Sequence, residues 1–244
     1  VRSRGLGDVY KRQENNFLTR LEQCYKSFYN DLRLAQSNID STPICEGGLS
    51  AYKKHLLDVI PEKRLGDDIE MALTVRAKGY KTVYDPEVAF LEQEASTLRS
   101  KMKQKIRRAT AIIEALLAHR DELFSERSKF GTVVLPMDYF FNIISPPLLL
   151  ISAITSLYLM LTGNMGLLVS TSLPTCLSLV LLTAYGTMRK SVKNIPFLIL
   201  ALIAAQMVLA IALLKLLMTS STSAWETIEE IRIPQQGQKV RRST

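Results

Sequence analysis

Apolar side chains recur at helical spacing between Glu14 and Ser37. This spacing predicts a helix that buries one face, with a stripe formed by Phe17, Leu21, Tyr25, Phe28 and Leu32. Ser41, Thr42 and Pro43 then break the pattern, and a short glycine-containing segment follows.

Two further helices are predicted on either side of an extended region. Asp67, with Glu70 three residues later, is typical of a helix start, and Gly79 is typical of a helix end. The pair Ser96-Thr97 can cap a longer helix that runs to about Leu123.

The region between these helices has the pattern of two short strands. We expect them at Tyr80–Tyr84 and Val88–Leu91, joined by a turn at Asp85-Pro86. The alternation of helices and strands predicts that residues 14–131 form an α/β domain whose first half precedes the chain.

From Val133 onward the chain carries few charges. Its long apolar runs approach or exceed the roughly 20 residues that a membrane-spanning helix needs. We expect an all-α membrane region over residues 132–218, with about three spans at approximately 142–162, 166–187 and 195–218. Residues 133–144 can form an interfacial helix, and residues 219–244 form a polar tail.

The basic residues Arg189, Lys190 and Lys193 lie between the second and third runs. By the positive-inside rule this loop is cytoplasmic, which also places the domain at residues 14–131 in the cytoplasm. Three cysteines without a pairing pattern agree with a reducing compartment. The side of the C-terminal tail stays open.

The N-terminal segment changes how the net charge of +8 is understood. Residues 3–13, SRGLGDVYKRQ, resemble the translation of a sequencing-library adapter, because Asp8–Gln13 can be encoded by GAT GTG TAT AAG AGA CAG. We therefore expect residues 1–13 to be non-native. They contribute four basic residues and one acidic residue, which leaves a net charge of +5 on the remainder.

Two classes of partner are disfavoured by the composition. The basic cluster between Arg99 and Arg108 contains no aromatic residue and adjoins an apolar region, so a solvated or headgroup-facing surface is a better interpretation than nucleic-acid binding. His55 and His119 are too few and too far apart for a histidine-based metal site, and we expect both at the surface.

The carboxylate pair Asp67-Asp68 is the first candidate for chemistry. At a helix start such a pair ordinarily caps the helix and complements its dipole, which contributes about 0.5–2 kcal/mol. A catalytic role requires partners farther along the chain, where Glu92, Thr97, Gln104 and Arg107 follow in order.

Several segments in order resemble membrane-bound family 2 glycosyltransferases of the cellulose and hyaluronan synthase-like superfamily. Asp67-Asp68 matches an acidic pair, and Gly79-Tyr80 matches a glycine-aromatic step at a helix end. The sequence EQEAST at 92–97 stands where the family has E-x-x-P-x-T, and QKIRR at 104–108 where it has Q-x-x-R-W. The resemblance implies a GT-A-like catalytic domain anchored by membrane helices.

The resemblance also implies roles for individual residues. Asp68 matches the catalytic base that takes the proton of the acceptor hydroxyl, and Asp67 would orient it. Gln104 and Arg107 match the segment that closes over the nucleotide diphosphate, and Arg108 follows them. The stretch from Gly47 and Gly48 to Lys53 resembles a loop that lines the donor and acceptor pocket, although an ordinary turn explains the two glycines equally well.

The chain also departs from the family pattern. Arg108 stands where the family has a tryptophan, Ala95 replaces a proline and Lys53 replaces an arginine. The tryptophan stacks on the acceptor sugar in processive synthases, so its absence favours a simpler transfer. Residues 14–131 contain no D-x-D motif, which in this family binds Mg²⁺ or Mn²⁺, and we expect those ligands before the chain begins.

The sequence thus predicts an inverting glycosyltransferase that moves a sugar from a nucleotide-sugar to a polyprenyl-phosphate lipid or a growing glycan. The transfer would take place at the cytoplasmic face of the cell membrane. By itself the chain should be inactive, because it would lack the donor-binding half. The alternative is a non-enzymatic membrane scaffold or transport component whose soluble domain binds a partner.

Overall fold

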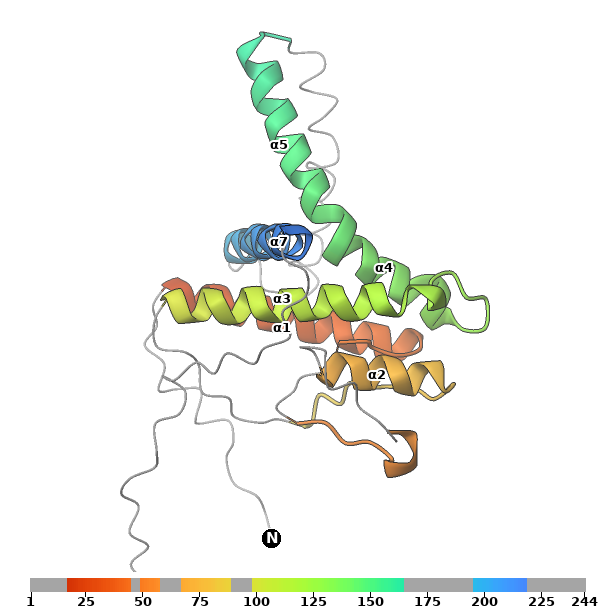
Figure 1. The fold of residues 1–244 in the computed structure, drawn as a ribbon. Coiled ribbons are helices and arrows are strands. Elements are labelled where there is room, and N and C mark those ends of the chain that lie inside the picture. The colour runs from red at the N-terminus through yellow and green to blue at the C-terminus, as the bar shows by residue number, and fades with distance from the viewer. Residues whose placement is uncertain (1–16, 45–48, 58–66, 89–97, 165–194, 219–244) are drawn as a thin grey trace, which may run out of the picture.

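The computed structural model describes residues 17–44, 49–57, 67–88, 98–164 and 195–218. These residues are almost entirely helical (Figure 1). In chain order the elements are α1 (Phe17–Ile39), η2 (Lys54–Leu56), α2 (Asp67–Ala77), α3 (Leu98–Ala118), η3 (Arg120–Glu122), η4 (Phe130–Val134), α4 (Leu135–Tyr139), η5 (Phe140–Ile144), α5 (Ser145–Leu161) and α7 (Ile195–Met218). The turns η4 and η5 are π-helical, and η4 to α5 form one continuous helical run.

The predicted α/β class is wrong for the described residues, which contain no strand. Tyr80–Tyr84, predicted as a strand, is not one: it lies along the end of α1 and not beside another strand. The backbone amides of Thr82 and Tyr84 donate to the hydroxyls of Ser41 and Ser37, at 3.3 Å and 2.8 Å. Side-chain hydroxyls thus take the donors that a neighbouring strand would otherwise use.

The link between this segment and the end of α1 is completed by a pair of threonines. The amide of Thr42 donates to the carbonyl of Thr82 at 2.9 Å, and the Thr82 hydroxyl donates to the Thr42 carbonyl at 2.7 Å. Of the second predicted strand, Val88 is not in a strand, and residues 89–91 lie outside the described part of the chain.

The end of α2 has the glycine motif that the sequence predicted. Gly79 has φ +83°, its amide donates to the carbonyl of Arg76, and the amide of Tyr80 donates to the carbonyl of Val75. These two bonds define a Schellman motif, which needs a left-handed residue at the position of Gly79. The predicted turn at Asp85 is confirmed as well, since the amides of Glu87 and Val88 both donate to Asp85.

The helices are arranged in layers (Figure 1). α7 packs against both α1 and α3, and α2 packs against α3. Ion pairs from Glu22 to Lys101 and Lys105 link α1 to α3. Ala109 and Ile113 of α3 meet Val208, Leu209 and Ala212 of α7 in one buried cluster. A second cluster joins α2 and α3 to the start of the helical run and contains Ile44, Ile69, Leu73, Ala115, Leu116, Phe130, Val134 and Leu135.

Within the described residues, two helices are long and apolar enough to cross a membrane: Phe130–Leu161 and Ile195–Met218. Only 17% and 33% of their most apolar windows are buried inside the protein, whereas a soluble core helix would be mostly covered. Both coincide with predicted spans, and this exposure favours membrane association. The predicted span at 166–187 lies outside the described residues, and the interfacial role of residues 133–144 stays a prediction.

A polar contact joins the two apolar helices. The hydroxyl of Ser145 donates to the side-chain oxygen of Gln206 at 2.9 Å, and the Gln206 amide donates to the carbonyl of Phe141 at 3.3 Å. Gln206 therefore has partners at both ends of its amide, which favours packing of α7 against the η5–α5 region inside an apolar environment.

Candidate functional site

The predicted catalytic pair lies at the start of α2. Asp67 is the first residue of the helix, and Asp68 is half-buried. The side chain of Asp68 accepts a hydrogen bond of 2.9 Å from the amide of Ile69. Amides at a helix N-terminus have no partner within the helix, and the helix dipole stabilises a carboxylate there. The position therefore suits an ionised carboxylate, as both the capping and the catalytic interpretation require.

The next acidic residue of α2 fixes the helix to α3. Glu70 is buried, and its Oε1 lies 3.0 Å from Nε2 of His119, just beyond the end of α3. The His119 side chain is only 17% exposed, so the prediction that it lies at the surface is wrong. His55 is exposed, as predicted. The apolar neighbours Ile69 and Leu73 share a buried cluster with Ala115 and Leu116 of α3.

The predicted diphosphate-binding residues lie on the first half of α3. Gln104 and Arg107 are half-buried and Arg108 is exposed. This half of the helix is tied to α1 by Glu22, whose carboxylate lies 3.6 Å from Nζ of Lys101 and 3.0 Å from Nζ of Lys105. Two lysines of the basic cluster therefore neutralise a carboxylate on α1 and are not purely solvated.

The structure does not bring the two halves of the predicted site face to face. Asp68 is two residues from Glu70, which contacts His119. Arg107 and Gln104 precede His119 by 12 and 15 residues, or about 18 Å and about 22 Å along a helix axis. The carboxylate pair thus lies beside the end of α3, whereas the predicted phosphate-binding residues lie toward its middle.

The third predicted element is described only in part. Gly47 and Gly48 lie outside the described residues. Lys53 is exposed and directly precedes the short helix η2. Within the described residues, no group of three or more His, Cys, Asp or Glu side chains could hold a metal ion. The part of the chain that is described therefore does not fit the divalent cation that the family pattern implies.

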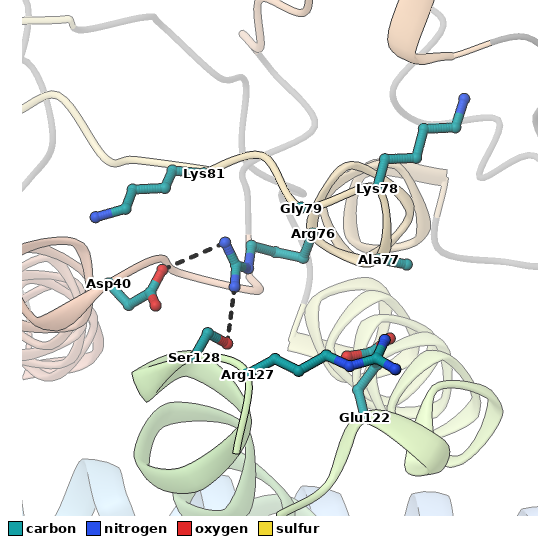
Figure 2. A pocket seen from close by; sticks show the side chains of 9 residues that line it. All are labelled: Asp40, Arg76, Ala77, Lys78, Gly79, Lys81, Glu122, Arg127 and Ser128. Carbon is teal, nitrogen blue, oxygen red and sulfur yellow. Dashed lines mark hydrogen bonds and ion pairs between the residues drawn. The ribbon is translucent and has the colours of Figure 1, made fainter. Parts of the chain in front are cut away.

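A charged cluster that the sequence did not predict joins α1, α2 and the start of the helical run. Nη1 of Arg76 lies 3.3 Å from Oδ1 of Asp40, and both side chains are more than 90% buried. Nη2 of Arg76 donates to the hydroxyl of Ser128 at 3.0 Å (Figure 2). The guanidinium also stacks over the ring of Phe130, at 4.8 Å from its centroid.

Asp40 also caps the first of the two apolar helices. Its Oδ2 accepts a hydrogen bond of 3.2 Å from the amide of Phe130, and its Oδ1 accepts one of 3.0 Å from the Ser41 hydroxyl. A carboxylate at this helix start satisfies an amide that has no partner within the helix. No local pattern signals this role, because Asp40 lies 90 residues before Phe130.

Comparison with known families identifies the family of the chain. The family described as glycosyl transferase family group 2 matches residues 6–219. The chain belongs to this family. The match covers α1, α2, α3 and both apolar helices, and it begins within the segment 1–13 that the sequence predicts to be non-native. Comparisons with curated proteins and with solved structures found no match.

Asp67 and Asp68 can be interpreted as a helix cap or as catalytic carboxylates, and membership in the glycosyltransferase family favours the catalytic interpretation. A helix cap needs no further residues, whereas glycosyl transfer needs a base near the acceptor hydroxyl and cations near the leaving diphosphate. The glycosyltransferase carries both residue types within the matched region, on α2 and α3. The assignments to individual residues stay predictions.

Proposed function

We propose that the chain forms the acceptor-side part of an inverting glycosyltransferase attached to a membrane, with its catalytic part in the cytoplasm. Membership in glycosyltransferase family group 2 carries this proposal. The two exposed apolar helices support attachment to the membrane. The donor would be a nucleotide-sugar, and the acceptor a polyprenyl-phosphate lipid or a growing glycan.

In the proposed reaction, the acceptor hydroxyl attacks the anomeric carbon of the donor sugar. A new bond forms between this oxygen and the anomeric carbon, the bond to the diphosphate oxygen breaks, and the configuration inverts. Asp68 takes the proton of the hydroxyl, and Asp67 orients Asp68. The hydrogen bond from the amide of Ile69 supports the role of Asp68, because it restrains the carboxylate at the helix start.

Gln104 and Arg107 would bind the diphosphate as it leaves, since a guanidinium binds phosphate oxygens through two parallel hydrogen bonds. The diphosphate is bonded to the reacting carbon, so Arg107 and Asp68 must face the same small space during the reaction. Arg107 and Asp68 do not face each other in the described structure, so the proposal includes a rearrangement of the chain when substrates bind. Gly47, Gly48, Lys53 and Arg108 would complete the pocket.

A divalent cation, Mg²⁺ or Mn²⁺, would neutralise the leaving diphosphate. We place its ligands outside the described residues, which do not fit a metal ion. The proposed work of this chain is to bind the acceptor, accept its proton and close over the phosphates.

The test uses membranes that contain the complete reading frame in which these residues occur. Transfer of radiolabelled sugar from a panel of nucleotide-sugars is measured with and without EDTA. Asp68→Asn should abolish transfer at unchanged expression, because the amide cannot accept the proton. Asp121→Asn, an exposed carboxylate in η3, is the matched control and should retain transfer. Unchanged transfer by Asp68→Asn removes this residue from its role, and no transfer from any donor favours a scaffold.

A further inference from the structure

A cavity of about 480 Å³ lies at the end of α2, away from the predicted catalytic pair (Figure 2). Its wall is formed by the Gly79 turn, by the end of α1 at Asp40 and by the segment from Glu122 to Ser128, which leads into the helix at Phe130. Arg76 follows Asp68 by eight residues, or about 12 Å along the helix axis. The cavity is therefore a separate site.

The charge in this cavity is positive. Its basic side chains are Arg76, Lys78, Lys81 and Arg127, and its acidic side chains are Asp40 and Glu122. The ion pair between Asp40 and Arg76 removes one charge of each sign. Three cations then face one carboxylate, which leaves a net charge of +2. Such a wall attracts an anion and repels a cation.

Two of these cations have no partner among the described residues. The side chains of Lys81 and Arg127 are exposed, and they form no ion pair or hydrogen bond with the described part of the chain. Lys78 differs, because its Nζ donates to the carbonyl of Leu56 at 2.7 Å. Lys81 and Arg127 therefore have all their donors available to a ligand.

Ser128 adds a neutral donor to the same wall. Its hydroxyl oxygen accepts hydrogen bonds from Nη2 of Arg76 at 3.0 Å and from the amide of Gly131 at 3.4 Å. A serine hydroxyl has two acceptor sites and one proton to donate. Both acceptor sites are filled, and the proton has no acceptor among the described residues. An anion in the cavity would accept it.

The cavity also lies close to the expected membrane surface. Ser128 precedes Phe130, where the first apolar helix begins, by two residues. Basic pockets beside the end of a membrane helix are placed to bind lipid headgroups. The wall of the cavity carries a hydroxyl donor, an ammonium and a guanidinium, which are the kinds of donor that phosphate oxygens accept.

We propose that this cavity binds a phosphate-bearing anion through Lys81, Arg127 and Ser128. The phosphate group can come from the headgroup of an anionic lipid or from a soluble phosphate. The proposal does not depend on the glycosyltransferase activity, because the cavity lies at the opposite end of α2 from Asp68. It is tested by binding alone.

The experiment measures affinity by calorimetry with the purified chain in neutral detergent micelles. Three probes are titrated: inorganic phosphate, micelles doped with short-chain phosphatidic acid, and micelles doped with short-chain phosphatidylcholine as the zwitterionic control. The double variant Lys81→Gln/Arg127→Gln should weaken binding about tenfold or more, because two charge-assisted hydrogen bonds are lost. Both side chains are exposed and unpartnered, so the variant should fold normally.

The matched control is Arg99→Gln/Lys103→Gln, which removes the same charge from exposed positions at the start of α3. It should leave the affinity for inorganic phosphate within about twofold, because charges outside the cavity are screened by salt. Glu122→Gln removes the remaining negative charge of the cavity, so it should tighten the binding of the anion. Phosphate binding identifies a soluble anion as the source, whereas binding of phosphatidic acid alone identifies a lipid headgroup. Equal losses in the two double variants, or no binding of either anion, overturn the proposal.

Discussion

Glu70 and His119 lie 3.0 Å apart and join the start of α2 to the end of α3. The contact brings together residues 49 positions apart, and the Glu70 side chain is only 5% exposed. Because Asp68 is two residues from Glu70, the same contact also fixes where the predicted catalytic carboxylate lies. We expect the loss of this contact to destabilise the fold.

Replacing His119 with alanine should destabilise the protein. The buried Glu70 carboxylate would lose a hydrogen-bond partner, which costs about 1–3 kcal/mol. His119→Gln keeps a side-chain donor and should lose less. The thermal unfolding midpoint in detergent micelles measures the effect, and His55→Ala, at an exposed histidine, is the control. Equal midpoints for His119→Ala and His55→Ala would show that the contact contributes nothing.

Removal of Arg76 should have a larger effect. Arg76→Met leaves Asp40 buried without its cation, and breaking a buried ion pair in this way costs about 3–5 kcal/mol. It also removes the hydrogen bond to Ser128 and the stacking on Phe130, so the start of the first apolar helix should loosen. Lys81→Met, at an exposed and unpartnered cation nearby, should change little.

A double-mutant cycle isolates the ion pair. Arg76→Met and Asp40→Leu are measured singly and together by unfolding midpoint and by hydrogen exchange at the amide of Phe130. If the pair stabilises the fold, the double variant is more stable than the sum of the single losses predicts. Strictly additive losses would show that Arg76 acts through its other contacts.

The helices could be predicted from the sequence because their signals are local. The apolar stripe of α1, the long apolar run of α7 and the glycine that ends α2 each lie within the element that they define. The structure confirms these elements within a few residues. The family resemblance rested on ordered motifs in α2 and α3, and it is confirmed by the match over residues 6–219.

The contacts that fix the site could not be predicted, because their partners lie far apart in the sequence. Tyr80–Tyr84 has the composition of a strand, but its donors are taken by hydroxyls at the end of α1, about 40 residues earlier. Gln36 similarly donates to both carboxylate oxygens of Asp138 across 102 residues. A single sequence gives no signal for such pairs, since each residue alone is typical of a surface position.

Cys24 should react slowly with thiol reagents. Burial raises the pKa of this thiol above its usual value, and the nearby Arg20 lowers it only in part. A raised pKa means less thiolate at a given pH, and the thiolate is the species that reacts. With Cys45 and Cys176 replaced by serine, alkylation at pH 8 should be slower than that of glutathione, and its rate should continue to rise at more alkaline pH. A rate equal to that of glutathione would contradict the shift.

Two glycines should respond differently to the same substitution. Gly79 has φ +83°, and an added Cβ would meet no atom within 4 Å, so Gly79→Ala pays only the left-handed backbone cost of about 1–2 kcal/mol. Gly131 has an ordinary φ, but its Cβ would lie 2.8 Å from the carbonyl oxygens of both Glu122 and Ser125. Those backbone atoms cannot move without opening the turn before the first apolar helix, so Gly131→Ala should cost about 3 kcal/mol or more.

Asparagine variants separate the backbone cause from the packing cause. Asparagine tolerates the left-handed region, so Gly79→Asn should recover part of the loss. Gly131→Asn should be at least as damaging as Gly131→Ala. The unfolding midpoints of the four variants rank their losses of stability. A larger loss for Gly79→Ala than for Gly131→Ala would contradict the packing of the turn.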